Sequence, residues 1–206
     1  MTIEQIRVGF DNFSYLIVSE QDTTAALVDP SSNAARALKI LEDNHLDLAY
    51  IILTHYHGDH VAALPDVKRN HPEAKVVASS EDGKFLRIKP DITASDGTRL
   101  QVGTIPVTVI STPGHTPGGI CLLVDDTALL TGDTLFIGDC GRTDLSDGSI
   151  EQMFNTLHKK IMTLPDSLIV YPGHDYGDKP FDSLGNQKKT NKTLRAKTLQ
   201  EFARIP

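Results

Sequence analysis

The sequence predicts a mixed α/β fold, of the α+β type, in which strand-rich segments are separated by helices. Short apolar runs rich in β-branched residues, such as 50–53 and 105–110, are typical of strands. Apolar residues that recur at intervals of three and four predict an amphipathic helix from Ser149 to Leu164. Several expected strands run directly into His or Asp, and α/β sheets build their ligand sites at such strand ends.

Each expected element follows from a local pattern of apolar, turn and capping residues. The first three strands form an antiparallel meander, and the expected strands are 3–8, 13–18, 25–28, 50–53, 75–78, 100–102, 105–110, 120–124, 128–130 and 168–171. Asp125-Asp126 indicates a hairpin turn, and 89–96 is expected to be a polar connector. Helix N-caps are expected among residues 31–33 and at Ser79 or Ser80. The expected helices are 34–44, 59–69, 80–87, 149–164 and 188–205.

These elements are expected to form one domain over residues 1–206, because no segment has the composition of a flexible linker. Two similar mixed halves would meet somewhere near 80–98. The domain would close with a basic C-terminal helix at about 188–205, for which a solvated surface face is the simpler interpretation.

Composition places the chain among ordinary globular proteins and narrows its partners. Of its 206 residues, 39% are hydrophobic and 23% are charged. The formal charge of −7 argues against a nucleic-acid partner, and no apolar run has the length of a membrane span. Residues 1–9 lack a signal-peptide pattern, so we expect a cytoplasmic protein, either a monomer or a homodimer. Cys121 and Cys140 are expected to be free thiols, with a single disulfide as the alternative.

The most informative stretch is the loop that follows the expected strand 50–53. It places four potential metal ligands within six residues, namely His55, His57, Asp59 and His60. Imidazole and carboxylate are ligands for zinc, iron and manganese. In a tight loop, His55 and His57 would face one metal, and Asp59 and His60 would face a neighbouring one. The simpler interpretation is a polar loop that happens to be rich in histidine.

Three later strand ends repeat this arrangement. His115 follows the strand 105–110 between Pro and Gly residues, Asp133 follows 128–130, and His174 follows 168–171. A single His after a strand is usually an ordinary loop residue. Four strand ends that all carry potential metal ligands predict a common site instead.

Together these residues resemble the ligand pattern of the metallo-β-lactamase superfamily, in particular the branch that holds glyoxalase II (hydroxyacylglutathione hydrolase) and the persulfide dioxygenases. The resemblance spans roughly residues 10–190 and implies a four-layer αββα sandwich with the metals at one edge, between the sheets. The binuclear hydrolases of the family imply two divalent ions, zinc first, with iron or manganese as further options. The implied ligand set is His55, His57 and His115 for one metal, Asp59, His60 and His174 for the other, and Asp133 as the bridge.

The hydrolase resemblance implies an enzyme in which metal-bound hydroxide attacks a thioester or related ester, such as a hydroxyacyl-glutathione. Asp133 would be catalytic as the bridging ligand, and Asp59 as a ligand that also accepts a proton. Cys140, Arg142 and Tyr176 are the candidate substrate-binding residues. For Arg142, the alternative is a salt bridge to a nearby Asp, and for Cys140 it is a small, half-buried apolar role.

The alternative enzyme is an iron-dependent persulfide dioxygenase that oxidises a glutathione-type persulfide to sulfite. It would bind a single Fe(II) through His55, His115 and Asp133. Cys140, Arg142 and Tyr176 resemble positions that these dioxygenases use around the substrate thiol, whereas Gly58 stands where they usually have Ala. A non-enzymatic metal-binding module is the third option, although carboxylate ligands favour an open, catalytic site.

Overall fold

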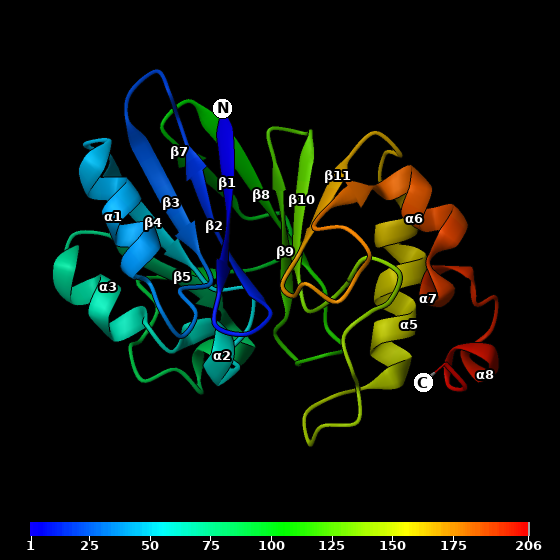
Figure 1. Cartoon of the computed structure of the whole chain (residues 1–206). Helices are drawn as coiled ribbons and strands as arrows, with labels where there is room; N and C mark the ends of the chain where they lie inside the picture. The colour runs from blue at the N-terminus through cyan, green and yellow to red at the C-terminus, as the bar shows by residue number, and fades with distance from the viewer. Residues whose placement is uncertain (206) are drawn as a thin grey trace.

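Two six-stranded β-sheets lie face to face in the computed structural model, which describes residues 1–205 (Figure 1). Helices cover the outer face of each sheet, so the layers follow one another as α, β, β and α. This arrangement confirms the predicted four-layer sandwich. Residue 206, the last of the predicted domain, lies outside the described residues.

The first sheet is built from the first half of the chain in sequence order, β1-β2-β3-β4-β5-β6. Its first three strands form the expected antiparallel meander, and β4, β5 and β6 then pair in parallel. The strands are β1 (Thr2–Val8), β2 (Asn12–Val18), β3 (Thr24–Val28), β4 (Asp47–Ile52), β5 (Lys75–Ser79) and β6 (Ile92–Ala94). Strand β6 lies within the segment expected to be a polar connector, where its three residues add an edge to the sheet.

The second sheet comes from the second half, in the order β12-β11-β10-β9-β8-β7. The chain therefore passes from one sheet to the other between Ala94 and Arg99, inside the predicted range. Asp125 and Asp126 have φ angles of 48° and 51°, as a tight turn between paired β-strands requires, so the predicted hairpin is confirmed. The strands are β7 (Arg99–Val102), β8 (Ile105–Ser111), β9 (Ile120–Val124), β10 (Ala128–Gly132), β11 (Ile169–Pro172) and β12 (Asp182–Ser183).

Three apolar layers hold the sandwich together. Side chains such as Ile17 and Leu122 fill the space between the sheets. Leu41 and Val67 pack helices against the first sheet, and Met153 packs a helix against the second. Because both faces of each sheet are covered, the central strands are apolar throughout rather than alternating.

The helices differ from the prediction mainly at their ends. Pro65 sits in the first turn of a new helix, where its missing N–H costs nothing, so the single helix expected over 59–69 is two helices. Ser79 caps its helix as expected. The N-cap of the helix after β3 is Ala34, outside the expected range 31–33, and it provides no side-chain cap. The helices are α1 (Ala35–Asp43), α2 (Gly58–Val61), α3 (Leu64–Asn70), α4 (Ser80–Gly83), α5 (Ile150–Lys159) and the 3₁₀ turn η1 (Ile161–Thr163).

The single C-terminal helix predicted over 188–205 is wrong. The chain forms three short helices, α6 (Leu184–Thr190), α7 (Lys192–Arg195) and α8 (Leu199–Phe202). Asn191 adopts extended backbone angles and its side chain accepts hydrogen bonds from the N–H groups that begin α7, and Thr198 does the same for α8. Capping side chains therefore interrupt the helical pattern. Over residues 1–205, no helix has the length and apolar character needed to cross a membrane.

Candidate metal centre

The loop after β4 is short and held rigidly from behind. The backbone N–H of Thr54 and its hydroxyl donate to the two carboxylate oxygens of Asp29, at 2.7 and 2.6 Å. His55 follows at once and is buried, and α2 begins only three residues later, so that His60 is also buried. The candidate ligands of this stretch therefore lie on a short loop and in the first turn of α2, and Asp29 fixes this loop to the sheet.

The first triad consists of His55, His57 and His115, whose ring nitrogens lie within 4.8 Å of one another. Nε2 of His115 lies 2.9 Å from Nδ1 of His57. His115 donates its Nδ1–H to the carbonyl of Arg142 at 2.8 Å, and His55 Nδ1 lies 3.1 Å from the Thr54 hydroxyl oxygen. With Nδ1 engaged in this way, both rings turn the Nε2 lone pair towards the centre.

The second triad consists of Asp59, His60 and His174, which likewise offer ligand atoms within 4.8 Å of one another. The Nε2 atoms of His60 and His174 are 3.1 Å apart. Asp59 Oδ2 lies 3.5 Å from the first of these nitrogens and 3.4 Å from the second. The Asp59 side chain is 51% exposed, which makes it the most accessible of the three.

Asp133 lies between the two triads. Its Oδ1 is 3.3 Å from His60 Nε2, and its Oδ2 is 3.4 Å from Nε2 of both His115 and His174. The preceding residue, Gly132, has a φ of +46°, and a Cβ there would lie 2.5 Å from the Thr54 hydroxyl oxygen. Glycine therefore allows the strand end to turn and bring the carboxylate to the centre.

The residues present fit two divalent cations. His55 Nε2 and Asp133 Oδ1 are buried and make no hydrogen bond. Imidazole nitrogens approach each other within about hydrogen-bonding distance although their Nδ1–H groups already have partners. Unpaired lone pairs that converge in a buried space require a positive charge. A carboxylate shared between two triads is also what a pair of neighbouring dications needs to reduce its repulsion.

The electrostatics of the centre keep His55 and Asp133 in their metal-binding forms and place a proton on His174. Burial lowers the pKa of His55, and the neighbouring His60 lowers it further, so this ring is neutral. Burial would raise the pKa of Asp133, but His60 and His174 hold it well below its usual range. Burial would lower the pKa of His174, but Asp133 and Asp59 raise it to about 10. A cation at this position would therefore displace a proton.

Asp29 supports both triads and was missed in the sequence. It binds Thr54, which contacts His55, and it accepts a hydrogen bond from His60 Nδ1 at 3.0 Å. Its oxygens also lie within 4.8 Å of ligand atoms of His55 and His60. Because those oxygens already accept bonds from Thr54, we assign Asp29 to positioning rather than ligation. The sequence could have identified Asp29, because it follows the strand 25–28 directly, just as the candidate ligands follow their strands.

The turn between β1 and β2 supports the second triad and was also missed. Asp11 Oδ1 accepts a hydrogen bond from His174 Nδ1 at 3.2 Å, and Asn12 donates to Asp59 Oδ2 at 2.9 Å. The sequence placed these two residues only between the expected strands 3–8 and 13–18, because polar residues are common in turns and the partners of these two lie more than 40 positions away.

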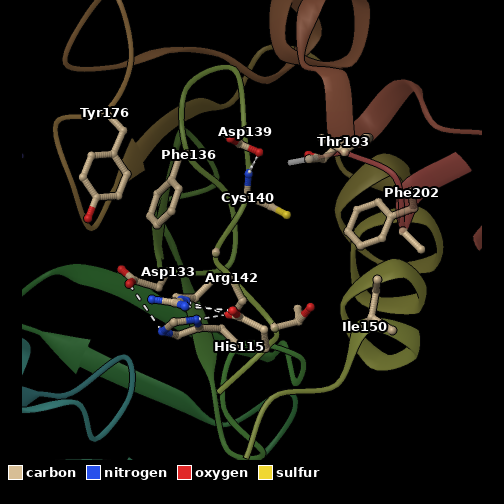
Figure 2. Close-up of a pocket in the computed structure, with 15 residues that line it drawn as sticks. His115, Asp133, Phe136, Asp139, Cys140, Arg142, Ile150, Tyr176, Thr193 and Phe202 are labelled. Carbon is tan, nitrogen blue, oxygen red and sulfur yellow. Dashed lines mark hydrogen bonds and ion pairs between the residues drawn. The ribbon is translucent and has the colours of Figure 1, made fainter. Parts of the chain in front are cut away.

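A cavity of about 520 Å³ opens beside the centre and contains all three predicted substrate-binding residues (Figure 2). Tyr176 stacks on His174, with ring centroids 4.7 Å apart. Cys140 is a free thiol, as is Cys121, in agreement with the prediction. Arg142 makes the predicted alternative contact, a bidentate salt bridge to Asp144 at 2.6 and 2.8 Å. The roles of the three residues towards a substrate stay predictions.

Comparison with known proteins agrees with this geometry. The family model for the metallo-beta-lactamase superfamily matches residues 7–174. Over 195 residues the chain is 30% identical to the mitochondrial persulfide dioxygenase ETHE1 of Homo sapiens, covering 94% of this chain and 75% of that one. It is 33% identical over 204 residues to a hydroxyacylglutathione hydrolase of Pelagibacter ubique, covering 98% and 83%.

Among solved structures, ETHE1 from Myxococcus xanthus superposes with a TM-score of 0.89 at 30% identity, over 100% of this chain and 92% of that one. The similar proteins therefore include both a dioxygenase and a hydrolase at comparable identity.

Proposed function

This chain belongs to the metallo-β-lactamase superfamily, and within that family we propose that it is a binuclear metal-dependent hydrolase of a thioester or related ester. The second triad carries the proposal. Asp59, His60 and His174 converge on one point, and Asn12, Asp29 and Asp11 each hold one of them in place. A site with three ligands for a single iron has no need of this triad or of its supports.

The residues divide the work of ester cleavage between them. When bound, two divalent ions, zinc first and iron or manganese as further options, supply a Lewis acid and a water of strongly lowered pKa. Asp133 keeps the triads together by reaching both. Asp59, whose side chain is half exposed, would accept the proton released from water. A thiolate leaving group needs no strong general acid, and none is required of Tyr176 or Cys140.

The expected partner is a small molecule derived from a thiol. The net charge of −7 supports a small-molecule partner over a nucleic acid. The cavity of about 520 Å³ is the size of a small-molecule site, and its floor contains His115 and Asp133.

The test is metal analysis combined with anaerobic turnover. Protein purified without added metal should hold two ions per chain and hydrolyse S-lactoylglutathione or a simpler thioester without O₂. His57→Ala and His174→Ala, one from each triad, should each remove about one ion and most of the activity. Fully loaded protein that hydrolyses no thioester would contradict the proposal.

A persulfide dioxygenase is the second candidate, favoured by the superposition on ETHE1 from Myxococcus xanthus over the whole chain. His55, His115 and Asp133 also meet here, as that reaction would require. Gly58 does not oppose it, because a Cβ at this position would meet nothing within 4 Å and an alanine would fit.

The same variants separate the two candidates. A dioxygenase should hold one iron per chain and consume O₂ with glutathione persulfide. His174→Ala should then leave both the iron content and the uptake of O₂ in place, because His174 is not one of its three ligands.

A further inference from the structure

The cavity beside the metal centre points to the chemistry of the thiol that carries the ester. We propose that the substrate is a thioester of a thiol without a carboxylate near the sulfur, so that an uncharged carrier is preferred over an anionic one. This inference rests on the proposed hydrolase function and concerns the same site. It follows from the charges and from the apolar walls of the cavity.

The cavity extends from the metal ligands to the C-terminal helices. Figure 2 shows His115 and Asp133 at one end, with Phe136 and Tyr176 above them, and Ile150 and Phe202 on the opposite side. A thioester with a small acyl group, whose carbonyl lies at the ligand end, would extend its thiol part along the 139–144 loop towards Ile150 and Phe202. Arg142 and Asp144 belong to that loop.

The charged groups along this path are already paired. Arg142 is the only Lys or Arg among the described residues that line the cavity, and its Nε and Nη2 each donate to one oxygen of Asp144. Asp139 pairs with Lys192 at 2.8 Å. Two of the five N–H groups of Arg142 are taken by Asp144, so a substrate carboxylate at the remaining three would lie close to the Asp144 carboxylate. Like charges held this close oppose binding.

The remaining lining favours an uncharged body. Ile150, Phe202, Ala203 and Ile205 form an apolar wall. Burial raises the pKa of the Cys140 thiol to about 12, and Asp139 adds to this effect, so the thiol is protonated and contributes a nearly apolar surface. An apolar or amide-containing carrier covers this wall without bringing a charge to it, whereas a carboxylate would lose part of its hydration near the carboxylates of Asp139 and Asp144.

The test uses two thioesters that differ by one carboxylate, S-acetyl-N-acetylcysteamine and S-acetyl-N-acetylcysteine. With the metal-loaded protein, kcat/KM should be about fivefold or more higher for the neutral ester, mainly through KM. Asp144→Asn frees Arg142 and should reduce this ratio by about fivefold. Ala203→Lys, which adds a cation at the exposed rim without touching Arg142, should also reduce it. Asp126→Asn is the matched control, because it removes the same charge at the β9–β10 hairpin and should leave the ratio unchanged.

Binding of ketone analogues, in which a methylene separates the sulfur from the carbonyl, keeps the inference testable apart from turnover. Tighter binding of the neutral analogue without hydrolysis of either ester would support the carrier preference and overturn the proposed hydrolase. Hydrolysis of both esters with equal or better kcat/KM for the carboxylate ester would overturn the carrier preference and leave the hydrolase in place. A ratio that Asp144→Asn does not change would overturn the role given to the Arg142–Asp144 pair.

Discussion

The two triads of the metal centre differ in the groups that stand behind them. In the first triad, His55 faces a threonine hydroxyl and His115 faces a backbone carbonyl. In the second triad, His60 and His174 each face a carboxylate, from Asp29 and Asp11. A carboxylate partner raises the basicity of an imidazole more than a neutral partner does. The second triad is therefore supported by charge, and the first by the backbone geometry of the 136–142 loop and by Thr54.

This difference shows that the N-terminal meander is part of the centre although it supplies no ligand. The supporting side chains of the second triad come from the β1–β2 turn, from the first residue of β2 and from the residue after β3. The half-exposed Asp59 needs such support, because an exposed ligand is otherwise free to leave the centre. Each of the following changes acts on one triad, on both, or on the groups behind them.

Substitution of the bridging residue Asp133 should affect both triads equally. Asp133→Asn leaves both triads without their shared anion, so we expect loss of both ions and a decrease in kcat/KM on the order of a thousandfold or more. Metal content by mass spectrometry and thioester turnover measure the two effects. Asp126→Asn is the control for the change in charge. If the variant keeps two ions per chain, Asp133 is not the bridge.

Removal of the metal should reduce the stability of the whole domain, because the centre joins strand ends from both sheets. Saturating ions that bind only the folded chain stabilise it by RT ln(1 + [L]/Kd), about 4 kcal/mol at a thousandfold excess over Kd. For a chain of this size, chelation should lower Tm by about 10 °C. Differential scanning calorimetry with and without chelator measures the shift. An unchanged Tm would contradict a metal site that bridges the sheets.

The sequence predicted the candidate ligands at the strand ends but not the side chains that hold these ligands in place. His55, Asp133 and the other candidate ligands could be selected because each follows an apolar strand directly, and strand ends meet at one edge. Asp11 and Asn12 follow no such rule, because polar residues are common in turns for local reasons. Their partners His174 and Asp59 are distant in sequence, so only the folded chain identifies them.

The prediction of one helix over the C-terminal segment 188–205 was wrong for a related reason. Its apolar spacing predicted one long helix, and spacing does not register a side chain that competes for backbone hydrogen bonds. Asn191 caps α7 and donates to the carbonyls of Phe136 and Asp139. The helix break thus results from a tertiary contact with the loop that carries the cavity wall.

Substitution of the carboxylates behind the second triad should weaken that triad more than the first. Asp29→Asn keeps the size of the side chain but replaces one carboxylate oxygen with an amide donor, so we expect the affinity for one ion to fall about tenfold to a hundredfold. Asp11→Asn should act in the same direction and less strongly, because Asp11 holds only His174. Titration of metal-free protein with zinc would reveal two unequal sites. Equal weakening of both sites would show that Asp29 supports the first triad, through Thr54, as much as it supports the second.

Substitution of Asn191 should destabilise the 136–142 loop, which supports the first triad. Asn191→Ala removes a helix cap and leaves the buried carbonyls of Phe136 and Asp139 without this donor. We expect a loss of about 2 kcal/mol in the free energy of unfolding. Urea denaturation measures it, and Thr190→Ala, at an exposed neighbouring position, is the control. If the variant lost metal from the second triad alone, the 136–142 loop would not support the first triad as assigned here.

The smallest effect is expected at Cys140, which the proposed hydrolysis does not use as a nucleophile. With a pKa of about 12, only about one thiol in 10⁵ is a thiolate at pH 7, and the pKa of about 11 for the fully buried Cys121 has the same consequence. Iodoacetamide at neutral pH should therefore modify neither thiol in the folded protein and both after unfolding, as peptide mass spectrometry would show. Rapid modification of Cys140 in the folded protein would mean that its thiol is ionised at the cavity wall. The 139–144 loop would then carry a third anion beside Asp139 and Asp144, and the assignment of Cys140 to a nearly apolar part of the cavity wall would not hold.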